Sequence, residues 1–192
     1  MSYRWGCFGF VVLLLLPTAL SAQNGSLVFL KAFYPLDEPH FHCVDIPGHK
    51  SRVDTSRPLN VHTCKEGIWH KDELFDLAAL KDGQLKMPEY GLCVTASSSN
   101  DGATLAVKAT IQSASLALRK FSPELSLKAH SGSCLTIGAE KSRLTPGGRR
   151  LPSRHLARSL QLEECSETAF QRQLWRFEVP QQRSGSVLPF AN

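Results

Sequence analysis

Short stretches in which apolar and polar residues alternate recur along this chain of 192 residues. The clearest stretch runs from Leu160 to Cys165, and a second one, from Leu174 to Phe177, follows after a short turn. Alternate residues of a strand share a face, so Trp175 and Phe177 are expected on the buried side of a strand. Glycine, proline and serine recur between such stretches, which favours an all-β domain over a helical bundle.

A similar order of residues occurs three times. Each copy starts with a Leu-Lys pair, continues after a turn with a cysteine and an apolar residue, and then has a second strand and an aromatic closing position. The starting pairs are Leu30-Lys31, Leu85-Lys86 and Leu127-Lys128, and the cysteines are Cys43, Cys93 and Cys134. The second strands end at Cys64, Thr110 and Cys165, and the closing aromatic residues are Phe75, Phe121 and Trp175. Three β-rich units at a period of roughly 40 to 50 residues are too few for a propeller and lack the helical half of a solenoid unit. They predict a β-trefoil, in which hairpins from the three copies bury a shared core.

Three motifs make residues 27–180 resemble a ricin-type (R-type) lectin domain. The motifs are a Cys-x-Asp that ends at Asp45, a Leu-Gln-Leu-x-x-Cys that ends at Cys165, and a Gln-x-Trp that ends at Trp175. The resemblance implies an all-β fold of the β-trefoil type and a carbohydrate-binding function.

The resemblance also implies how the cysteines pair, because each bridge of such a domain lies within one repeat. Cys43 is expected to pair with Cys64, and Cys134 with Cys165. In the middle repeat Thr110 stands where the second cysteine is expected, so Cys93 has no partner. Two interpretations of Cys93 remain open, a buried free thiol or an exposed thiol that forms an intermolecular disulfide.

In ricin-type lectins an acid two residues after the first cysteine, a stacking ring before the second cysteine and an Asn-Gln pair form the sugar site. The first repeat carries Asp45, His62 and the pair Asp72-Glu73 at these positions, with Asn60 two residues before the ring. Trp69, in the turn between them, could replace His62 as the platform. Thr95 and Thr136 replace the acid in the other repeats, so no ordinary sugar site is expected there.

The first-repeat site departs from the family pattern. Three carboxylates, Asp45, Asp72 and Glu73, are expected to crowd one pocket, where their repulsion either raises a pKa or recruits a cation. His62 is a poorer platform than Trp or Tyr and could change charge near neutral pH. The alternative is a scaffold turn in which Asp45 only hydrogen-bonds the hairpin backbone.

Residues 1–22 predict a secretory signal peptide, with Arg4, an apolar run from Val11 to Leu16, and the small residues Ser21 and Ala22. The alternative is an uncleaved signal anchor. Cleavage after Ala22 predicts a secreted, extracellular protein without a membrane span, and it removes one of the six cysteines. Asn24 is then the acceptor of a glycosylation sequon, and residues 181–192 are expected to form a flexible tail.

The positive charge of the chain is concentrated in one stretch. Without Arg4 the chain has 21 Lys and Arg against 17 Asp and Glu, or +4, and six of the basic residues fall within 141–159. We interpret this loop as an anion patch for heparan sulfate or another sulfated glycosaminoglycan. One alternative is a solvated, mobile insertion, and another is a dibasic processing point at Arg149-Arg150. The expected patch residues are Arg143, Arg149, Arg150, Arg154 and Arg158. Because the other residues sum to slight acidity, nucleic-acid binding is not expected.

No catalytic motif, cofactor motif or zinc motif is present, and His40-Phe41-His42 alone is a weak metal signal, so the protein is not expected to be an enzyme. Two functions therefore remain. The first is a secreted lectin that binds glycans or glycoproteins, with at most one family-type sugar site in the first repeat. The second is a β-trefoil interaction module without sugar binding that uses the 141–159 loop.

Overall fold

The computed structural model of the chain describes residues 27–66, 70–109, 119–120, 125–128, 133–148 and 154–180. The expected signal peptide, the expected tail and several residues named above lie outside these ranges. Those residues are Asn24, Trp69, Thr110, Phe121, Arg149 and Arg150. Among the helices of the described ranges, none has the length and apolar character needed to cross a membrane.

Strands are the main regular secondary structure of the described residues, and the helices are short, which confirms the all-β prediction. The strands of the first part are β1 (Leu27–Ala32), β2 (His42–Asp45), β3 (Asn60–Thr63) and β4 (Leu74–Asp76). The middle part contributes β5 (Lys86–Met87), β6 (Leu92–Ala96), β7 (Leu105–Ala109), β8 (Arg119–Lys120) and β9 (Leu125–Lys128). The last part contributes β10 (Ser133–Ile137), β11 (Arg143–Leu144), β12 (Leu156–Glu164) and β13 (Leu174–Glu178). The helices are α1 (Leu77–Lys81), α2 (Phe170–Gln173) and the 3₁₀ turns η1 (Lys50–Arg52) and η2 (Lys71–Glu73).

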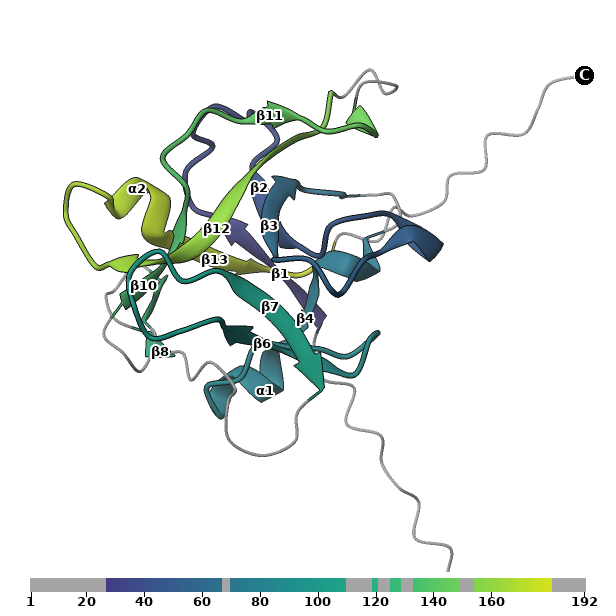
Figure 1. Ribbon diagram of the computed structural model, residues 1–192, viewed down its shortest axis with the longest axis horizontal. Coiled ribbons are helices and arrows are strands. Elements are labelled where there is room, and N and C mark those ends of the chain that lie inside the picture. The colour runs from purple at the N-terminus through teal and green to yellow at the C-terminus, as the bar shows by residue number, and fades with distance from the viewer. Residues whose placement is uncertain are drawn as a thin grey trace, which may run out of the picture.

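The main sheet follows the order β10-β12-β3-β2-β1-β13-β9-β8, with β11 paired to β12 and β4 paired to β1. It curls, and β9 pairs with β10 as well as with β13, so the sheet path returns to its first strand (Figure 1). Strands β5, β6 and β7 form a separate sheet. The curled sheet therefore surrounds an interior that side chains fill.

Three antiparallel hairpins, β2–β3, β6–β7 and β10–β12, have matching registers. The cysteine of each first strand lies opposite His62, Lys108 or Glu163 of the second strand. Each of these three residues lies two positions before the aligned residue Cys64, Thr110 or Cys165, so they occupy equivalent positions of the three repeat copies. Local alternation of side chains thus gives each repeat copy a hairpin with the same pairing.

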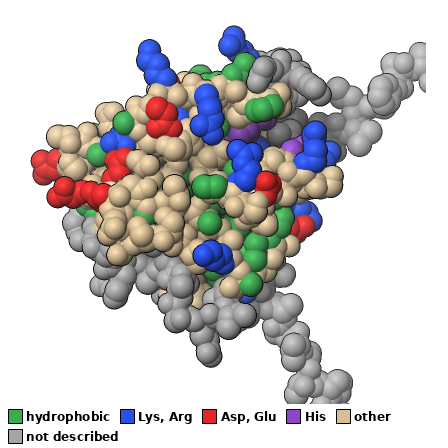
Figure 2. Space-filling model, in the orientation of Figure 1, with side chains coloured by type: hydrophobic (Ala, Val, Ile, Leu, Met, Phe, Trp, Pro, Cys, Tyr) green, Lys and Arg blue, Asp and Glu red, His purple; other side chains and the backbone are tan. Residues whose placement is uncertain are grey.

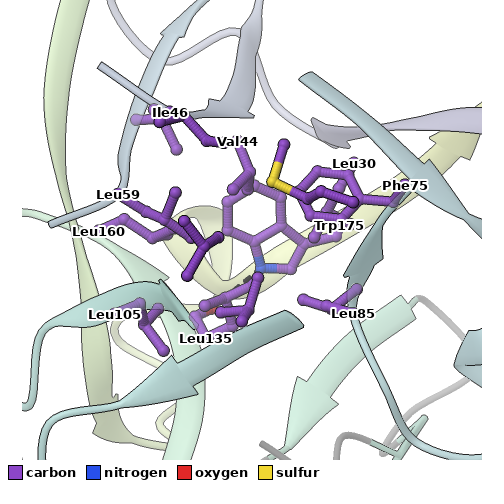
Figure 3. Close-up of a cluster of buried hydrophobic side chains, with 14 of the residues drawn as sticks. Leu30, Val44, Ile46, Leu59, Phe75, Leu85, Leu105, Leu135, Leu160 and Trp175 are labelled. Atoms are coloured by element: carbon purple, nitrogen blue, oxygen red, sulfur yellow. Dashed lines mark hydrogen bonds between the residues drawn. The ribbon is translucent and has the colours of Figure 1, made fainter. Parts of the chain in front are cut away.

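Trp175 lies in the middle of the core. Its side chain is fully buried, and its indole Nε1–H donates a hydrogen bond to the carbonyl oxygen of Leu135 at 2.9 Å. Figure 3 shows apolar side chains from all three repeat copies around the indole, among them Leu30, Val44, Phe75, Leu85, Leu105 and Leu160. Phe177 packs against the edge of this cluster and is only partly buried. The buried face predicted from the alternating pattern is therefore the inner face of the sheet.

The structure contains the disulfides Cys43–Cys64 and Cys134–Cys165, which are the two pairs that the resemblance implies. Each bridge ties the start of a hairpin to the residue that follows its second strand. Cys93 is a free cysteine and is buried, as the first interpretation of this residue requires. A buried thiol cannot link two chains, so the intermolecular disulfide is wrong for this conformation.

Candidate functional site

The residues that the resemblance assigns to a sugar site lie together. Asp45 ends β2 and is paired directly with Asn60 at the start of β3. Asp72 and Glu73 lie in η2, which is held beside β2 by a hydrogen bond from the Ile46 backbone N–H to the Asp72 carbonyl oxygen at 3.2 Å. The hairpin register and this single turn together bring three carboxylates into one buried cluster.

Lys65, which directly follows Cys64 in the sequence, occupies the centre of this cluster. Its Nζ donates to Asp45 Oδ1 at 2.9 Å and to Asp72 Oδ2 at 2.5 Å, and its backbone N–H donates to Glu73 Oε2 at 2.9 Å. Lys65 is 3% exposed, Asp45 1%, and Asp72 and Glu73 0%. The Lys65 ammonium group thus pairs with two of the carboxylates that the resemblance assigns to a sugar site, and no carboxylate of the cluster faces solvent.

Burial and mutual repulsion change the acidity of these groups. Burial raises the pKa of Asp45 well above its usual value, and the charge of Lys65 only partly offsets this increase. Burial and the neighbouring Asp45 charge raise the pKa of Glu73 in the same way. Burial acts to lower the pKa of Lys65, but the surrounding carboxylates outweigh it and raise that pKa above its usual value. The ammonium group of Lys65 is therefore charged at neutral pH, and it compensates part of the negative charge.

His62 is neutral in this environment. Burial, followed by the charge of Lys65, lowers the pKa of His62 to about 3, so the expected change of charge near neutral pH is wrong. Its Nδ1–H donates to the Thr63 carbonyl oxygen at 2.8 Å, because a carbonyl can only accept. The ring packs edge-on against His155, with 5.1 Å between the ring centroids. A buried ring held in this way offers no open face on which a sugar could stack.

Two residues of this cluster are missed by sequence reasoning. Lys65 has a signal, since three acids at one site call for a cation and a lysine adjoins Cys64. Tyr90 has none, because it comes from the turn between β5 and β6 of the second repeat. Burial, followed by the charge of Asp72, raises the pKa of Tyr90 to about 12. The hydroxyl of Tyr90 and the Asn60 Oδ1 are buried without a hydrogen-bond partner among the described residues.

The equivalent positions of the other two repeats are also internal. The hydroxyl of Thr95 donates to the Ala106 carbonyl oxygen at 3.3 Å. The hydroxyl of Thr136 donates to the Cys134 carbonyl oxygen at 2.9 Å and accepts from Gln173 Nε2 at 3.0 Å. Both threonines therefore brace their hairpins through these hydrogen bonds.

The predicted anion patch is only partly exposed. Arg143 on β11 and Arg154, just before β12, are exposed. Arg158 is 6% exposed, and its Nη1 lies 3.4 Å from Asp37 Oδ1, so its place on the exposed patch is wrong. Asp37 also accepts from the Ser142 hydroxyl at 2.7 Å, which fixes β11 against the β1–β2 connection. Arg158 therefore pairs with a carboxylate of its own chain and helps to hold this segment in place.

Lys50 and Arg52 of η1 form a second basic segment. Burial and the charges of Lys65, Lys50 and Arg52 lower the pKa of His49, and His49 contributes in turn to the lowered pKa of His155. The η1 turn is therefore within electrostatic reach of the start of β12. We call the exposed cations of the two segments the basic surface: Lys50, Arg52, Lys141, Arg143 and Arg154. Figure 2 shows Lys and Arg side chains over the top of this face and beside the visible His side chains.

Comparisons with known proteins add no relative. Neither a scan against protein-family models nor a search of curated proteins gives a match for this chain. The function has to be inferred from the residues themselves.

Proposed function

We propose that this protein is a secreted β-trefoil of the ricin-type lectin architecture that binds sulfated, anionic glycans on its basic surface. In this proposal the family-type sugar site of the first repeat is closed. The proposed function is still carbohydrate binding, as the resemblance implies, but the proposed binding site is the exposed basic surface and not the pocket around Asp45.

The β-trefoil part of the proposal is supported by the three hairpins with matching registers and by a core built from all three copies. The sheet path that returns to its first strand is a further point in favour, because a trefoil needs a closed barrel. Secretion is supported by the two disulfides, which persist mainly in oxidising compartments.

The observation that carries the proposal is the bond between Lys65 and Asp45. A sugar that used Asp45 would have to displace the ammonium group and leave it unpaired in a buried site. Breaking one side of a buried ion pair costs about 3 to 5 kcal/mol. A millimolar monosaccharide gains only about 4 kcal/mol on binding, so the displacement consumes essentially all of that energy. A neutral-sugar site at Asp45 is therefore the weaker hypothesis.

The basic surface has the properties that an anion site requires. Its cations are exposed, they come from two segments within electrostatic reach of each other, and an exposed ion pair forms without a large desolvation cost. Affinity then comes from several weak contacts in parallel, and salt screens each of them. A sulfated chain with repeated charges suits such a surface better than one isolated anion does.

The proposal is tested by titrating the mature protein with a heparin-type oligosaccharide and with its desulfated counterpart at several salt concentrations. The double variant Arg143→Gln/Arg154→Gln is expected to bind more weakly. By analogy with other polyanions, the slope of log affinity against log salt should fall by about two. The matched control is Lys86→Gln/Lys108→Gln, which removes two exposed charges from the separate β5–β6–β7 sheet and should bind like wild type. Equal binding of the desulfated oligosaccharide, or equal loss in both double variants, would contradict the proposal.

A further inference from the structure

We propose that the buried cluster of the first repeat binds a divalent metal ion through Asp45, His62 and Glu73. The inference is independent of glycan binding on the basic surface, since it concerns buried side chains and none of the exposed cations. It starts from a charge imbalance and from an oxygen atom without a partner.

The charge imbalance follows from the composition of the cluster. Three carboxylates, Asp45, Asp72 and Glu73, share one buried site with a single ammonium group, that of Lys65. When all four groups are ionised, two negative charges remain. Burying uncompensated charge is costly, so the site has to be neutralised by two protons or by one divalent cation. A divalent cation supplies the missing charge in one step.

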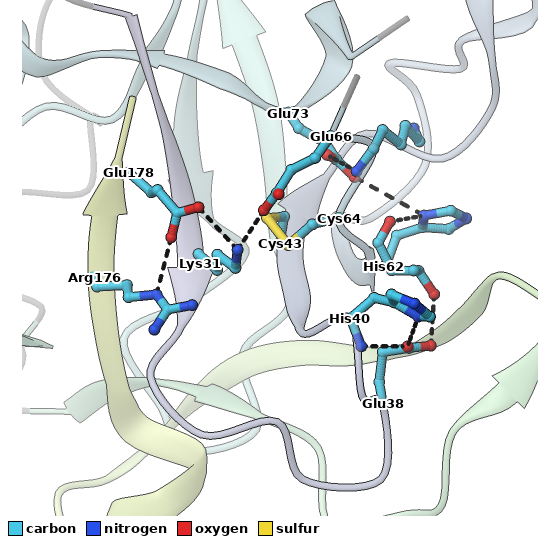
Figure 4. Close-up of a disulfide and its surroundings, with 12 residues drawn as sticks. Lys31, Glu38, His40, Cys43, His62, Cys64, Glu66, Glu73, Arg176 and Glu178 are labelled. Atoms are coloured by element: carbon cyan, nitrogen blue, oxygen red, sulfur yellow. Dashed lines mark hydrogen bonds and ion pairs between the residues drawn. A yellow bond between two sulfur atoms is a disulfide. The ribbon is translucent and has the colours of Figure 1, made fainter. Parts of the chain in front are cut away.

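Two carboxylate oxygens of the cluster, Asp72 Oδ1 and Glu73 Oε1, are buried without a hydrogen-bond partner among the described residues, and the one on Glu73 is close to His62. Lys65 bonds to Asp45 Oδ1, Asp72 Oδ2 and Glu73 Oε2, whereas Glu73 Oε1 is buried and accepts no hydrogen bond in the described part of the chain. This oxygen lies 3.9 Å from His62 Nδ1, and Figure 4 shows the two side chains directed toward each other. A fully buried carboxylate oxygen with an open lone pair is an unusual feature and calls for a ligand.

The geometry suits a small cation. One ligand atom each of Asp45, His62 and Glu73 can be chosen so that all three lie within 4.8 Å of one another. Metal–ligand bonds of about 2.0 to 2.2 Å would draw these atoms together by roughly 1 Å, which side-chain rotation can supply. The Thr63 carbonyl oxygen, 2.8 Å from His62 Nδ1, is close to the spacing of adjacent ligands and offers a fourth position. On binding, the ring proton of His62 moves from Nδ1 to Nε2, so the ring stays neutral.

The ligand types indicate which ions to expect. Two carboxylates, one imidazole and one carbonyl oxygen match Zn²⁺ or Mn²⁺ better than Ca²⁺, which prefers six to eight oxygen ligands. The Cys43–Cys64 bridge lies beside the site, since Cys43 pairs with His62 across the hairpin and Cys64 precedes Lys65. An ion at this position would link β2, β3 and η2, so its expected role is structural.

The test uses the purified, untagged mature protein after treatment with EDTA. Native mass spectrometry and thermal unfolding are recorded with Zn²⁺, Mn²⁺, Ca²⁺ or Mg²⁺ added. We expect one Zn²⁺ or Mn²⁺ per chain, and a rise in Tm of about 5 to 10 °C at a hundredfold excess over the Kd. Glu73→Gln, which keeps an oxygen to accept from the Lys65 N–H, should abolish both effects. Glu66→Gln, which changes a partly exposed acid outside the cluster, should leave both effects unchanged.

Other results would overturn the inference. If none of the four ions stays bound and Tm does not change, two protons neutralise the cluster, and Glu73→Gln should then stabilise the protein. Binding that persists in Glu73→Gln would place the ion elsewhere. If Glu73→Gln does not fold, His62→Gln takes its place, with exposed His40→Gln as the matched control. Sulfated-glycan binding is measured on the same metal-free samples, so failure of one proposal is distinguishable from failure of the other.

Discussion

Replacing Lys65 by methionine tests whether its ammonium group holds the first-repeat site closed. Methionine keeps most of the length and volume of the side chain but leaves Asp45 and Asp72 without their buried partner. Removing one member of a buried ion pair costs about 3 to 5 kcal/mol, a large part of the roughly 5 to 15 kcal/mol that stabilises a domain. With an m value of about 2 kcal/mol/M in urea, the unfolding midpoint should fall by about 1.5 to 2.5 M.

Urea unfolding in the presence of EDTA, followed by tryptophan fluorescence, measures this change without interference from metal ions. Lys71→Met is the matched control, because the pair of Lys71 with Glu89 is 50% and 42% exposed and should contribute less than about 1 kcal/mol. The loss in Lys65→Met should also shrink as the pH falls toward 4. Unpaired carboxylates have raised folded pKa values, so their cost is present at high pH and disappears once the unfolded chain is protonated as well. A loss below about 1 kcal/mol that does not vary with pH would refute the assignment of Lys65 to this role.

Three further predictions concern other buried side chains. Burial lowers the pKa of His42 to about 4, below the unfolded value of 6.5. The stability that neutral His42 contributes to the fold is therefore present above pH 6.5 and is lost as the pH falls toward 4. Wild type should therefore lose about 3 kcal/mol relative to His42→Gln over that range, and parallel pH profiles would contradict this. Cys93 should react with Ellman's reagent only after unfolding, and reaction in native buffer would show that it is not buried. Trp175→Phe should lower the free energy of unfolding by about 2 to 4 kcal/mol, since it leaves a cavity and a Leu135 carbonyl without its hydrogen bond. Calorimetry measures this loss, and a clearly smaller loss would contradict the prediction.

The hairpins and the positions of their residues could be predicted because they depend on local pattern. Side chains alternate along a strand, so the spacing from Cys43 to Asp45 and from Asn60 to His62 fixes which residues meet across the β2–β3 hairpin. The same reasoning places Cys93 opposite Lys108 without a disulfide partner. Local periodicity was sufficient for these features.

The state of the first-repeat site could not be predicted from that pattern. The direction of Lys65 depends on the η2 turn that brings Asp72 back to β2, and no local rule specifies such a turn. The sequence therefore predicted the crowding of three carboxylates, but it did not predict that Lys65 neutralises part of their charge.

Arg158 is a different case, because the sequence carries a signal for its burial. β12 extends from Leu156, and Arg158 has the same parity as Leu160 and Leu162, whose side chains are in the core. Treating residues up to 159 as one loop hid this alternation. A strand begun four residues earlier would have assigned Arg158 to the covered face. The electrostatic influence of His49 on His155, by contrast, links segments about a hundred residues apart and has no local signature.

The most direct test of the proposed function is a glycan array probed with wild type and Asp45→Asn, at physiological and at raised salt. The side-chain amide of the Asp45→Asn variant would still offer an oxygen to the Lys65 ammonium group, so the variant is expected to fold, which circular dichroism can check. We expect binding to sulfated glycans only, weakened by salt and unchanged by the substitution. Binding to neutral galactose-type glycans that resists salt and disappears in Asp45→Asn would contradict the proposed function.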